Sequence, residues 1–406
     1  MVAAPTAAAH AHRRGTRTVR QENSLNLIRL VLAALVLVSH AFLLGGFGPE
    51  PRVAGQTLGT WAVHGFFAIS GYLIIGSRFS HRMVPYLLKR VARIMPGFLV
   101  CNVVVAFAVA PVAWLLTGGS LPRLFAADDS PVDYVVSNAA LWIHQYDIAG
   151  GPAGVPYPHA WNGSLWSLYY EFVCYLTVGV LALHPGMRKP RVVAGILTVA
   201  IGAWGVLATL GVTGQPKAIA LLLSLFLGGA LLQTLARRGL VVTAPGALLA
   251  ALGLWGLIAL AGDWGPLLSA PLLAYLLIWL STVLPSPTLV RRHDISYGCY
   301  IYAFPVQQLL ATVGLHRAGI VTFVAVTAAV TTGLAVLSWR HVESPSLRLA
   351  ARLPRLRTHS RLRTHADGPR RPRLQLEPGT VAAPVATDHV SVPTEASNPA
   401  LAERVS

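Results

Sequence analysis

The sequence predicts an all-α fold: a polytopic membrane protein of about ten transmembrane helices, with both termini in the cytoplasm. Three observations predict this. Apolar residues make up 54% of the 406 residues and charged residues only 12%, whereas soluble domains carry roughly 25% charged residues. The mean hydropathy is +0.58. Apolar stretches long enough to cross the hydrocarbon core recur along the chain, and each of them favours a membrane-spanning helix.

Ten such stretches follow one another, and a backbone in hydrocarbon must satisfy its own hydrogen bonds, which favours a helix at each of them. In order, the expected spans are 25–44, 57–77, 96–116, 164–184, 192–211, 217–235, 241–261, 265–284, 296–316 and 319–339.

The basic residues predict the orientation. Four precede the first span, five lie between the second and third spans, and others follow the fourth, sixth, eighth and tenth spans. Of the 32 Lys and Arg, 27 thus fall on one side and four on the other. The positive-inside rule assigns the richer side, and with it both termini, to the cytoplasm.

The same basic loops account for the formal net charge of +17, because they face anionic lipid. Nucleic acid is therefore not an expected partner. Three Lys against 29 Arg indicate a GC-rich genome and hence a bacterial plasma membrane as the location. The oligomeric state cannot be derived from the sequence.

The domain organisation follows from composition. We expect a basic cytoplasmic arm at 1–24, a membrane domain at 25–345, and a disordered, Arg- and Pro-rich cytoplasmic tail at 346–406. Within the membrane domain, 117–163 is expected to be an external loop. The Cys and His residues have no metal-ligand spacing, so no metal site is expected.

Two ionisable residues, Arg29 and His40, lie inside the first span. An ionisable side chain in hydrocarbon costs several kcal/mol, which makes both residues functional candidates. Eleven helical residues rotate through about 1100° and rise ~16 Å. Arg29 and His40 are therefore expected on one face of the helix at two depths, with Arg29 toward the cytoplasm.

Glu171 in the fourth span is expected at a depth similar to that of His40, ~10 Å below the external surface by helix rise. A carboxylate beside an imidazole holds one tautomer of the ring, an arrangement used in general base catalysis. The alternative is a buried ion pair that only joins two helices, and the two interpretations are equally supported at this point.

Six sequence motifs, in order, resemble those of the acyltransferase 3 family of multipass membrane acyltransferases. They are Arg29 and His40 with ten residues between them, FFAISGY at 66–72, KRVARIMP at 89–96, LWSLYYE at 165–171, ISYGCYIYAFPV at 295–306 and HVESP at 341–345. Two positions depart from the family pattern. Ala303 and Phe304 precede Pro305 where members often have His, and His64 stands where many have Asp.

The resemblance implies an O-acyltransferase that moves an acyl group, with acetyl as the family default, from a cytoplasmic acyl-CoA to a hydroxyl of a carbohydrate or similar acceptor. His40 is then expected to act as the general base, with Glu171 orienting its ring. An acyl-His intermediate is the less favoured version. The acyl-CoA is a donor substrate, and no bound cofactor is expected.

Arg90 and Arg93 lie three residues apart at the start of the third span, so they share a helical face. Together with Arg29 they are expected to bind the phosphates of the donor. For Arg90, positive-inside anchoring is an equally good explanation, whereas Arg29 lies within a span. Glu343 is expected to pair with Arg340 or His341 in a structural role.

Several further residues are candidates for lining the acceptor path, each with a structural alternative. For Ser70 and Tyr72 the alternative is close helix packing beside Gly71, which we prefer. For Trp166 and Ser167 it is helix packing, and for Tyr300 it is aromatic anchoring at the interface.

Two other classes of function are compatible with intramembrane Arg, His and Glu. A transporter or flippase for a glycan or lipid-linked sugar would predict inverted repeats with broken helices, and the sequence shows no such pairing. A non-enzymatic membrane partner protein would not depend on an acyl donor.

Overall fold

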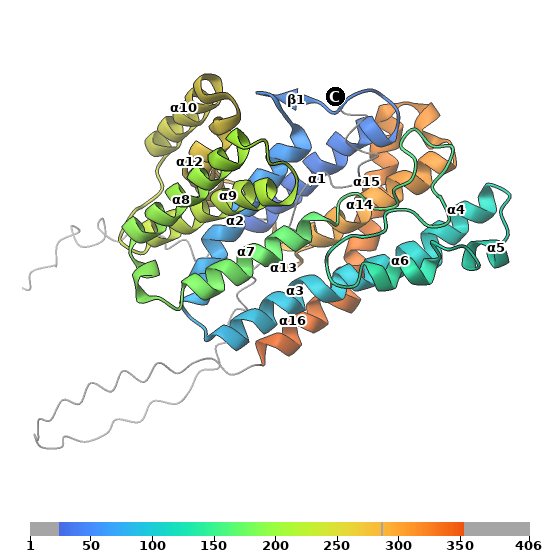
Figure 1. Cartoon of the computed structure of the whole chain (residues 1–406), viewed down its shortest axis with the longest axis horizontal. Coiled ribbons are helices and arrows are strands. Elements are labelled where there is room, and N and C mark those ends of the chain that lie inside the picture. The colour runs from blue at the N-terminus through green and yellow to red at the C-terminus, as the bar shows by residue number, and fades with distance from the viewer. Residues whose placement is uncertain (1–23, 286, 353–406) are drawn as a thin grey trace, which may run out of the picture.

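The computed structural model describes residues 24–285 and 287–352 (Figure 1). The expected basic arm, apart from Ser24, and residues 353–406 of the expected tail lie outside the described residues. Apart from loops and irregular segments, the described chain is helical except for one hairpin of two two-residue strands, β1 (Arg52–Val53) and β2 (Gln56–Thr57). The all-α prediction is confirmed.

A helix is present at each of the ten predicted spans. These helices are α1 (Leu25–Leu44), α2 (Leu58–Arg78), α3 (Met83–Val104), α7 (Ser167–Leu181), α8 (Pro190–Thr209), α9 (Gln215–Ala236), α10 (Ala244–Ala261), α12 (Ala270–Val283), α14 (Ser296–Thr312) and α15 (Ile320–Ser338). The shorter helices are α4 (Ala110–Leu116), α5 (Leu121–Phe125), α6 (Pro131–Ser137), α11 (Gly265–Leu268), α13 (Thr288–Arg292) and α16 (Ser344–Ala351).

Within the described residues, seven helices are long and apolar enough to cross a membrane, and α7 and α12 are shorter apolar helices. This confirms a polytopic membrane protein, while the predicted orientation of the termini stays a prediction. Figure 1 shows α8, α9, α10 and α12 grouped on one side of α1 and α2, with α3 and α16 running along the other side.

The helix α14 is the most enclosed of these elements. It carries three tyrosines and two glutamines, and nearly all of its residues are buried. Protein rather than lipid therefore surrounds this polar helix, which lets its side chains hydrogen-bond to neighbouring segments. Gly298 lets α14 approach α15 closely, since an added Cβ there would lie 2.7 Å from the Cα of Ala335.

The third helix begins earlier than predicted. We expected residues 78–95 to connect two spans, but α3 starts at Met83 and continues through α4 to Leu116. Arg90 and Arg93, expected to share a helical face at the start of the span, thus lie inside α3, and both side chains are buried. The Tyr175 ring lies beside the Arg90 guanidinium group, whereas the Tyr297 ring and two carboxylates surround that of Arg93.

The last helix also differs from its predicted boundary. The expected disordered tail begins at residue 346, yet α16 continues the final helix to Ala351. The side of α16 that includes Ala350 is buried, and α16 packs against α3. Tertiary contact therefore extends a helix into a segment whose composition favours disorder.

Close backbone contact joins α2 to α9. An added Cβ on Gly71 would lie 1.7 Å from the carbonyl oxygen of Phe226, and one on Gly229 would lie 1.9 Å from that of Ala68. No side chain fits between these backbones, which is how small residues join membrane helices. This contact supports the packing interpretation that we preferred for the segment around Gly71.

The predicted loop 117–163 contains α5, α6 and an irregular segment that folds back onto α14. Gln308 donates hydrogen bonds to the carbonyl oxygens of Tyr157 and Ala160, both at 2.7 Å. Asn162 donates to the carbonyl oxygen of Ile301 at 2.8 Å. The end of this loop therefore lies inside the protein and leads directly into α7.

Candidate active site

His40 lies in the last turns of α1 with 3% of its surface exposed. Its Nδ1 is 2.8 Å from Oε1 of Glu50, and Oε2 of the same carboxylate accepts a hydrogen bond from the Ser39 hydroxyl at 2.6 Å. The sequence analysis predicted Glu171 beside the imidazole. The structure instead pairs the imidazole with Glu50, which lies only ten residues further along the chain.

A short hairpin brings Glu50 back over the end of α1. Leu58 donates its backbone N–H to the carbonyl oxygen of Pro51 at 2.9 Å, and the Trp61 indole donates to that of Val53 at 2.8 Å. Thr57 then caps α2 by accepting the backbone N–H of Thr60 at 3.0 Å. These bonds tie both ends of the hairpin to α2.

Glu50 is held as an anion. Burial raises the pKa of this carboxyl group, but the charge of His40 and hydrogen bonds from His40, Ser39 and Thr57 outweigh it and lower the pKa to about 2. Opposite charge and hydrogen bonding both favour the ionised form. A carboxylate is therefore present at the imidazole throughout the neutral pH range.

The helix α14 forms another wall of the His40 site. The Phe304 ring meets the imidazole edge-on, with the ring centroids 5.6 Å apart. An added Cβ on Gly163 would lie 2.8 Å from the same phenyl ring. One of the two positions that depart from the family pattern before Pro305 thus contacts His40 directly.

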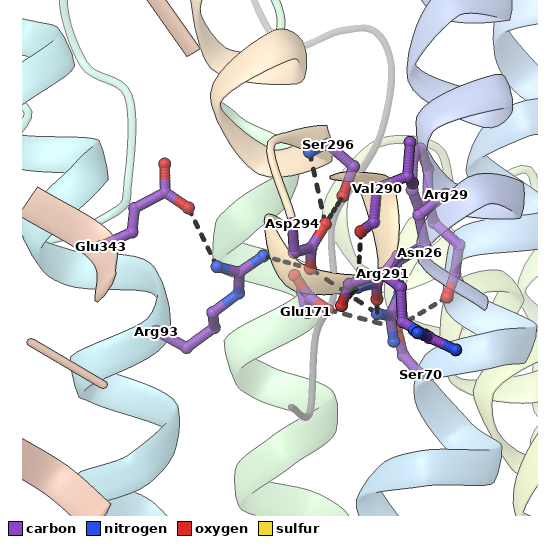
Figure 2. Close-up of polar contacts among 11 residues, drawn as sticks. Asn26, Arg29, Ser70, Arg93, Glu171, Val290, Arg291, Asp294, Ser296 and Glu343 are labelled. Carbon is purple, nitrogen blue, oxygen red and sulfur yellow. Dashed lines mark hydrogen bonds and ion pairs between the residues drawn. The ribbon is translucent and has the colours of Figure 1, made fainter. Parts of the chain in front are cut away.

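At the other end of α1, buried charges form the arginine cluster, which consists of Arg29, Arg90, Arg93, Asp294, Glu343 and Glu171. Figure 2 labels all of these residues except Arg90. Arg93 joins two acids, with Nη1 at 2.9 Å from Glu343 and Nη2 at 3.0 Å from Asp294. Arg29 lies 3.7 Å from Asp294 and is 1% exposed. Three formal positive charges therefore face three acidic groups.

Glu171 lies in the arginine cluster rather than at His40. Its Oε1 accepts hydrogen bonds from Tyr175 at 2.8 Å and from Ser70 at 3.4 Å. It also interacts electrostatically with Arg93 and Arg29. Arg90 is positioned over the Tyr175 ring, 6.0 Å from its centroid, so it belongs to the same group.

The depth of Glu171 was mispredicted because α7 does not begin at the membrane surface. The segment before it is already buried, since Asn162, Ser164 and Leu165 have almost no exposed surface. The Tyr300 hydroxyl donates to the carbonyl oxygen of Ser164, which ties this segment to α14. A helix that starts inside the protein carries its second turn deeper than a surface start would.

The remaining predicted residues make separate contacts with neighbouring segments. Ser70 contacts Glu171, while the Ser167 hydroxyl lies 3.4 Å from that of Tyr300. Trp166 packs edge-on against Tyr170, with the ring centroids 4.9 Å apart. The backbone N of Tyr72 lies at the close contact with Gly229. None of these four contacts joins the His40 site to the arginine cluster.

Besides Glu171, three acidic residues were missed or misassigned. Glu50 is the only acidic residue between Glu22 and Asp128, and Asp294 is the only one between Asp263 and Glu343. A single acidic residue in a long stretch without others was the sequence feature that could have identified Glu50 and Asp294 as candidates. Glu343 was expected to pair with Arg340 or His341, but it bonds Arg93 and accepts from Ser338 at 2.9 Å.

Comparison with known proteins identifies the family of the chain. The sequence profile of the acyltransferase 3 family, described as an acyltransferase domain, matches residues 22–340. An O-acetyl transferase of Shigella phage Sf6 is 30% identical over 339 residues, covering 80% of this chain and 96% of that protein. Nodulation protein 10 of Rhizobium leguminosarum bv. viciae is 28% identical over 377 residues, covering 82% of this chain and 95% of that protein.

No solved structure matches the chain significantly. The family profile spans most of the chain, including α1 with its buried Arg29 and His40 and the arginine cluster except for Glu343. The family match decides the functional class in favour of an enzyme rather than a transporter. The chain belongs to the acyltransferase 3 family and is a multi-pass membrane O-acyltransferase.

Proposed function

We propose that the enzyme transfers a short acyl group, acetyl in the first instance, from acyl-CoA to a hydroxyl of a carbohydrate or glycosylated acceptor, with His40 as the general base. The observation that carries the proposal is the burial of both ionisable residues of α1, at 1% exposure for Arg29 and 3% for His40. Ionisable groups kept inside a membrane domain mark functional paths.

The donor binds at the Arg29 end of α1. Arg29, Arg90 and Arg93 supply guanidinium groups, which suit phosphate oxygens. Asp294 and Glu343 already occupy Arg93, so the phosphates of acyl-CoA compete with these carboxylates for it. Glu171 lies among the same residues and belongs to the donor end, where its carboxylate accepts hydrogen bonds from the donor arm.

The acyl group then reaches His40 along α1, since the two residues are separated by about 16 Å of helix rise. His40 takes the proton of the acceptor hydroxyl as the oxygen attacks the thioester carbonyl. The new C–O bond forms and the C–S bond breaks, so the CoA thiolate leaves. The thiolate takes up a proton, and His40 returns to its neutral form.

The acceptor path includes the polar groups between the two ends of the molecule. Ser167 and Tyr300 present hydroxyls at the start of α7, with Trp166 beside them. Ser70 and Tyr72 lie on α2 near the close contact with α9. The name of the phage relative supports acetyl as the transferred group, and the family resemblance supports a sugar hydroxyl as the acceptor.

The location in the cell follows from the charge distribution. We propose a bacterial plasma membrane with both termini in the cytoplasm, since basic residues gather on that side. In this orientation the arginine cluster faces the cytoplasmic supply of acyl-CoA, and His40 lies near the external surface.

The test uses bacterial cells that express the wild-type chain or His40→Ala and are fed labelled acetate. Mass spectrometry of the extracted glycan fraction measures labelled O-acetyl esters. We expect esters with the wild-type chain and none above background with His40→Ala at equal membrane abundance. His64→Ala, which also removes a buried imidazole, is the matched control. Full ester formation by His40→Ala would refute the assigned base.

A further inference from the structure

Glu50 is the acidic residue nearest to the proposed base, and no sequence motif pointed to it. We infer that Glu50 is a positioning residue for acyl transfer: its carboxylate holds the His40 ring with Nδ1 toward the hairpin, so that Nε2 is the basic nitrogen. This inference rests on the proposed function of His40. It replaces Glu171 in the orienting role that the sequence analysis predicted.

The tautomer follows from the chemistry of the contact. An ionised carboxylate can only accept hydrogen bonds, so the Nδ1 atom at 2.8 Å from Glu50 must carry the hydrogen. In a neutral imidazole the lone pair is then on Nε2. The Nε2 atom is buried within the protein, which is where a reacting hydroxyl would have to meet the base.

The geometry of Glu50 is fixed from its other oxygen. Ser39 donates to Oε2 at 2.6 Å, and the same hydroxyl accepts the backbone N–H of Gly59 at 3.0 Å. The Ser39 hydroxyl of α1 therefore joins the backbone of α2 to the Glu50 carboxylate, which fixes the position of that carboxylate. The arrangement costs no reorganisation when the reaction begins.

This network also assigns a role to Ser39. In nucleophilic triads the imidazole lies between the hydroxyl and the carboxylate. Here the carboxylate lies between the hydroxyl and the imidazole, so the imidazole cannot activate this serine. Ser39 thus supports the general base and does not carry the acyl group.

The carboxylate also acts while the proton is being transferred. When Nε2 takes the proton of the acceptor hydroxyl, the ring becomes positively charged, and the ionised Glu50 beside Nδ1 stabilises that charge. The proton then passes to the departing thiolate, and the ring regains its starting tautomer. Glu50 neither gains nor loses a proton, so it acts through His40 and does not touch the substrate.

The decisive experiment measures steady-state kinetics of the purified full chain in lipid nanodiscs. Acetyl-CoA is the donor and the glycan fraction of the host membrane is the acceptor. We expect Glu50→Gln to lower kcat by about 100-fold and to leave the KM for acetyl-CoA within about twofold. The acid limb of its pH–rate profile should move to lower pH, because a neighbouring carboxylate favours the protonated ring. Glu50→Asp should recover part of the rate.

A matched control separates this role from simple support of the hairpin. Trp61→Phe removes the hydrogen bond to Val53 and leaves Glu50 intact, so its kcat should stay within about twofold of the wild-type value. Equal losses in Trp61→Phe and Glu50→Gln would overturn the inference, as would a wild-type kcat and pH profile in Glu50→Gln. If His40→Ala is inactive while Glu50→Gln keeps the wild-type kcat and pH profile, only this inference is refuted. If His40→Ala is active, the proposed function is refuted.

If Glu50→Gln fails to give a monodisperse protein, Glu50→Asp and Ser39→Ala replace it, since both retain a carboxylate. The inference then requires kcat to fall in both variants with little change in the KM for acetyl-CoA. An unchanged kcat in both folded variants would overturn it.

Discussion

The two ends of α1 use buried charge in opposite ways. At the His40 end, one imidazole meets one carboxylate, and each oxygen of that carboxylate has a defined hydrogen-bond partner. At the Arg29 end, three guanidinium groups interleave with three acidic groups from α7, the segment before α14 and the turn between α15 and α16. The first arrangement is a single hydrogen-bonded pair with fixed partners, whereas the second joins separate segments of the chain by ion pairs.

The difference between the two ends of α1 shows that a residue of a family motif can pair with residues outside that motif. Arg93 belongs to a family motif and suggests a phosphate ligand, yet its guanidinium group is satisfied by Asp294 and Glu343. Breaking such a buried pair leaves uncompensated charges. With the donor site proposed above, the arginine cluster would have to rearrange on donor binding, whereas the proposed base at His40 would need no rearrangement.

The largest effect should come from removing the base. With acetyl-CoA and the host glycan fraction, His40→Ala is expected to lower kcat by roughly 10²- to 10⁴-fold, the range for loss of a general base. Thermal unfolding in detergent should show a Tm close to that of the wild-type protein. A folded His40→Ala protein with a rate within tenfold of wild type would contradict the assignment of the general base to the His40 end of α1.

The next largest effect should be structural and confined to the arginine cluster. Arg93→Met leaves Asp294 and Glu343 buried without their shared cation, so we expect a loss of about 3 to 5 kcal/mol of stability. The measurement is the Tm in detergent. Arg188→Met is the control, because that arginine is exposed and packs only over the Phe79 ring. Comparable Tm values for both variants would contradict a structural role for Arg93.

A pH-dependent stability difference is expected at the His40 end. The pKa of Glu50 is lowered from 4.5 to about 2, so its contribution is fully present above pH 4.5 and is lost as the pH falls toward 2. The shift corresponds to at most about 3 kcal/mol. The Tm difference between wild type and Glu50→Gln should therefore shrink as the pH falls below 4. A difference that persists unchanged at pH 2.5 would contradict the ionised pair.

The smallest effect should distinguish two buried serines. Ser39→Ala removes one hydrogen bond to the Glu50 anion and is expected to slow kcat by about tenfold. Ser224 is equally buried but donates only to the carbonyl oxygen of Ala220 in its own helix, so Ser224→Ala should change kcat less than twofold. Steady-state rates with acetyl-CoA measure both variants, and equal rates would argue against the role assigned to Ser39.

The local sequence was sufficient to predict the helices and the shared helical face of Arg29 and His40. Ten apolar windows predicted a helix at each of ten places, because helix formation in hydrocarbon depends on side-chain composition over about 20 residues. Helix periodicity was also sufficient to predict Arg29 and His40 on a single buried face, since their relative position depends on one helix alone.

Only the tertiary structure decided the partners of these residues. Glu50 reaches His40 through a hairpin, and Glu171 lies deep because the segment before α7 folds onto α14. Asp294 and Glu343 meet Arg93 from segments about 200 residues or more away in the chain. Hydropathy predicts which segments lie in the hydrocarbon core of the membrane. The pairing of buried charges depends instead on where irregular segments turn and on the depth at which each helix begins.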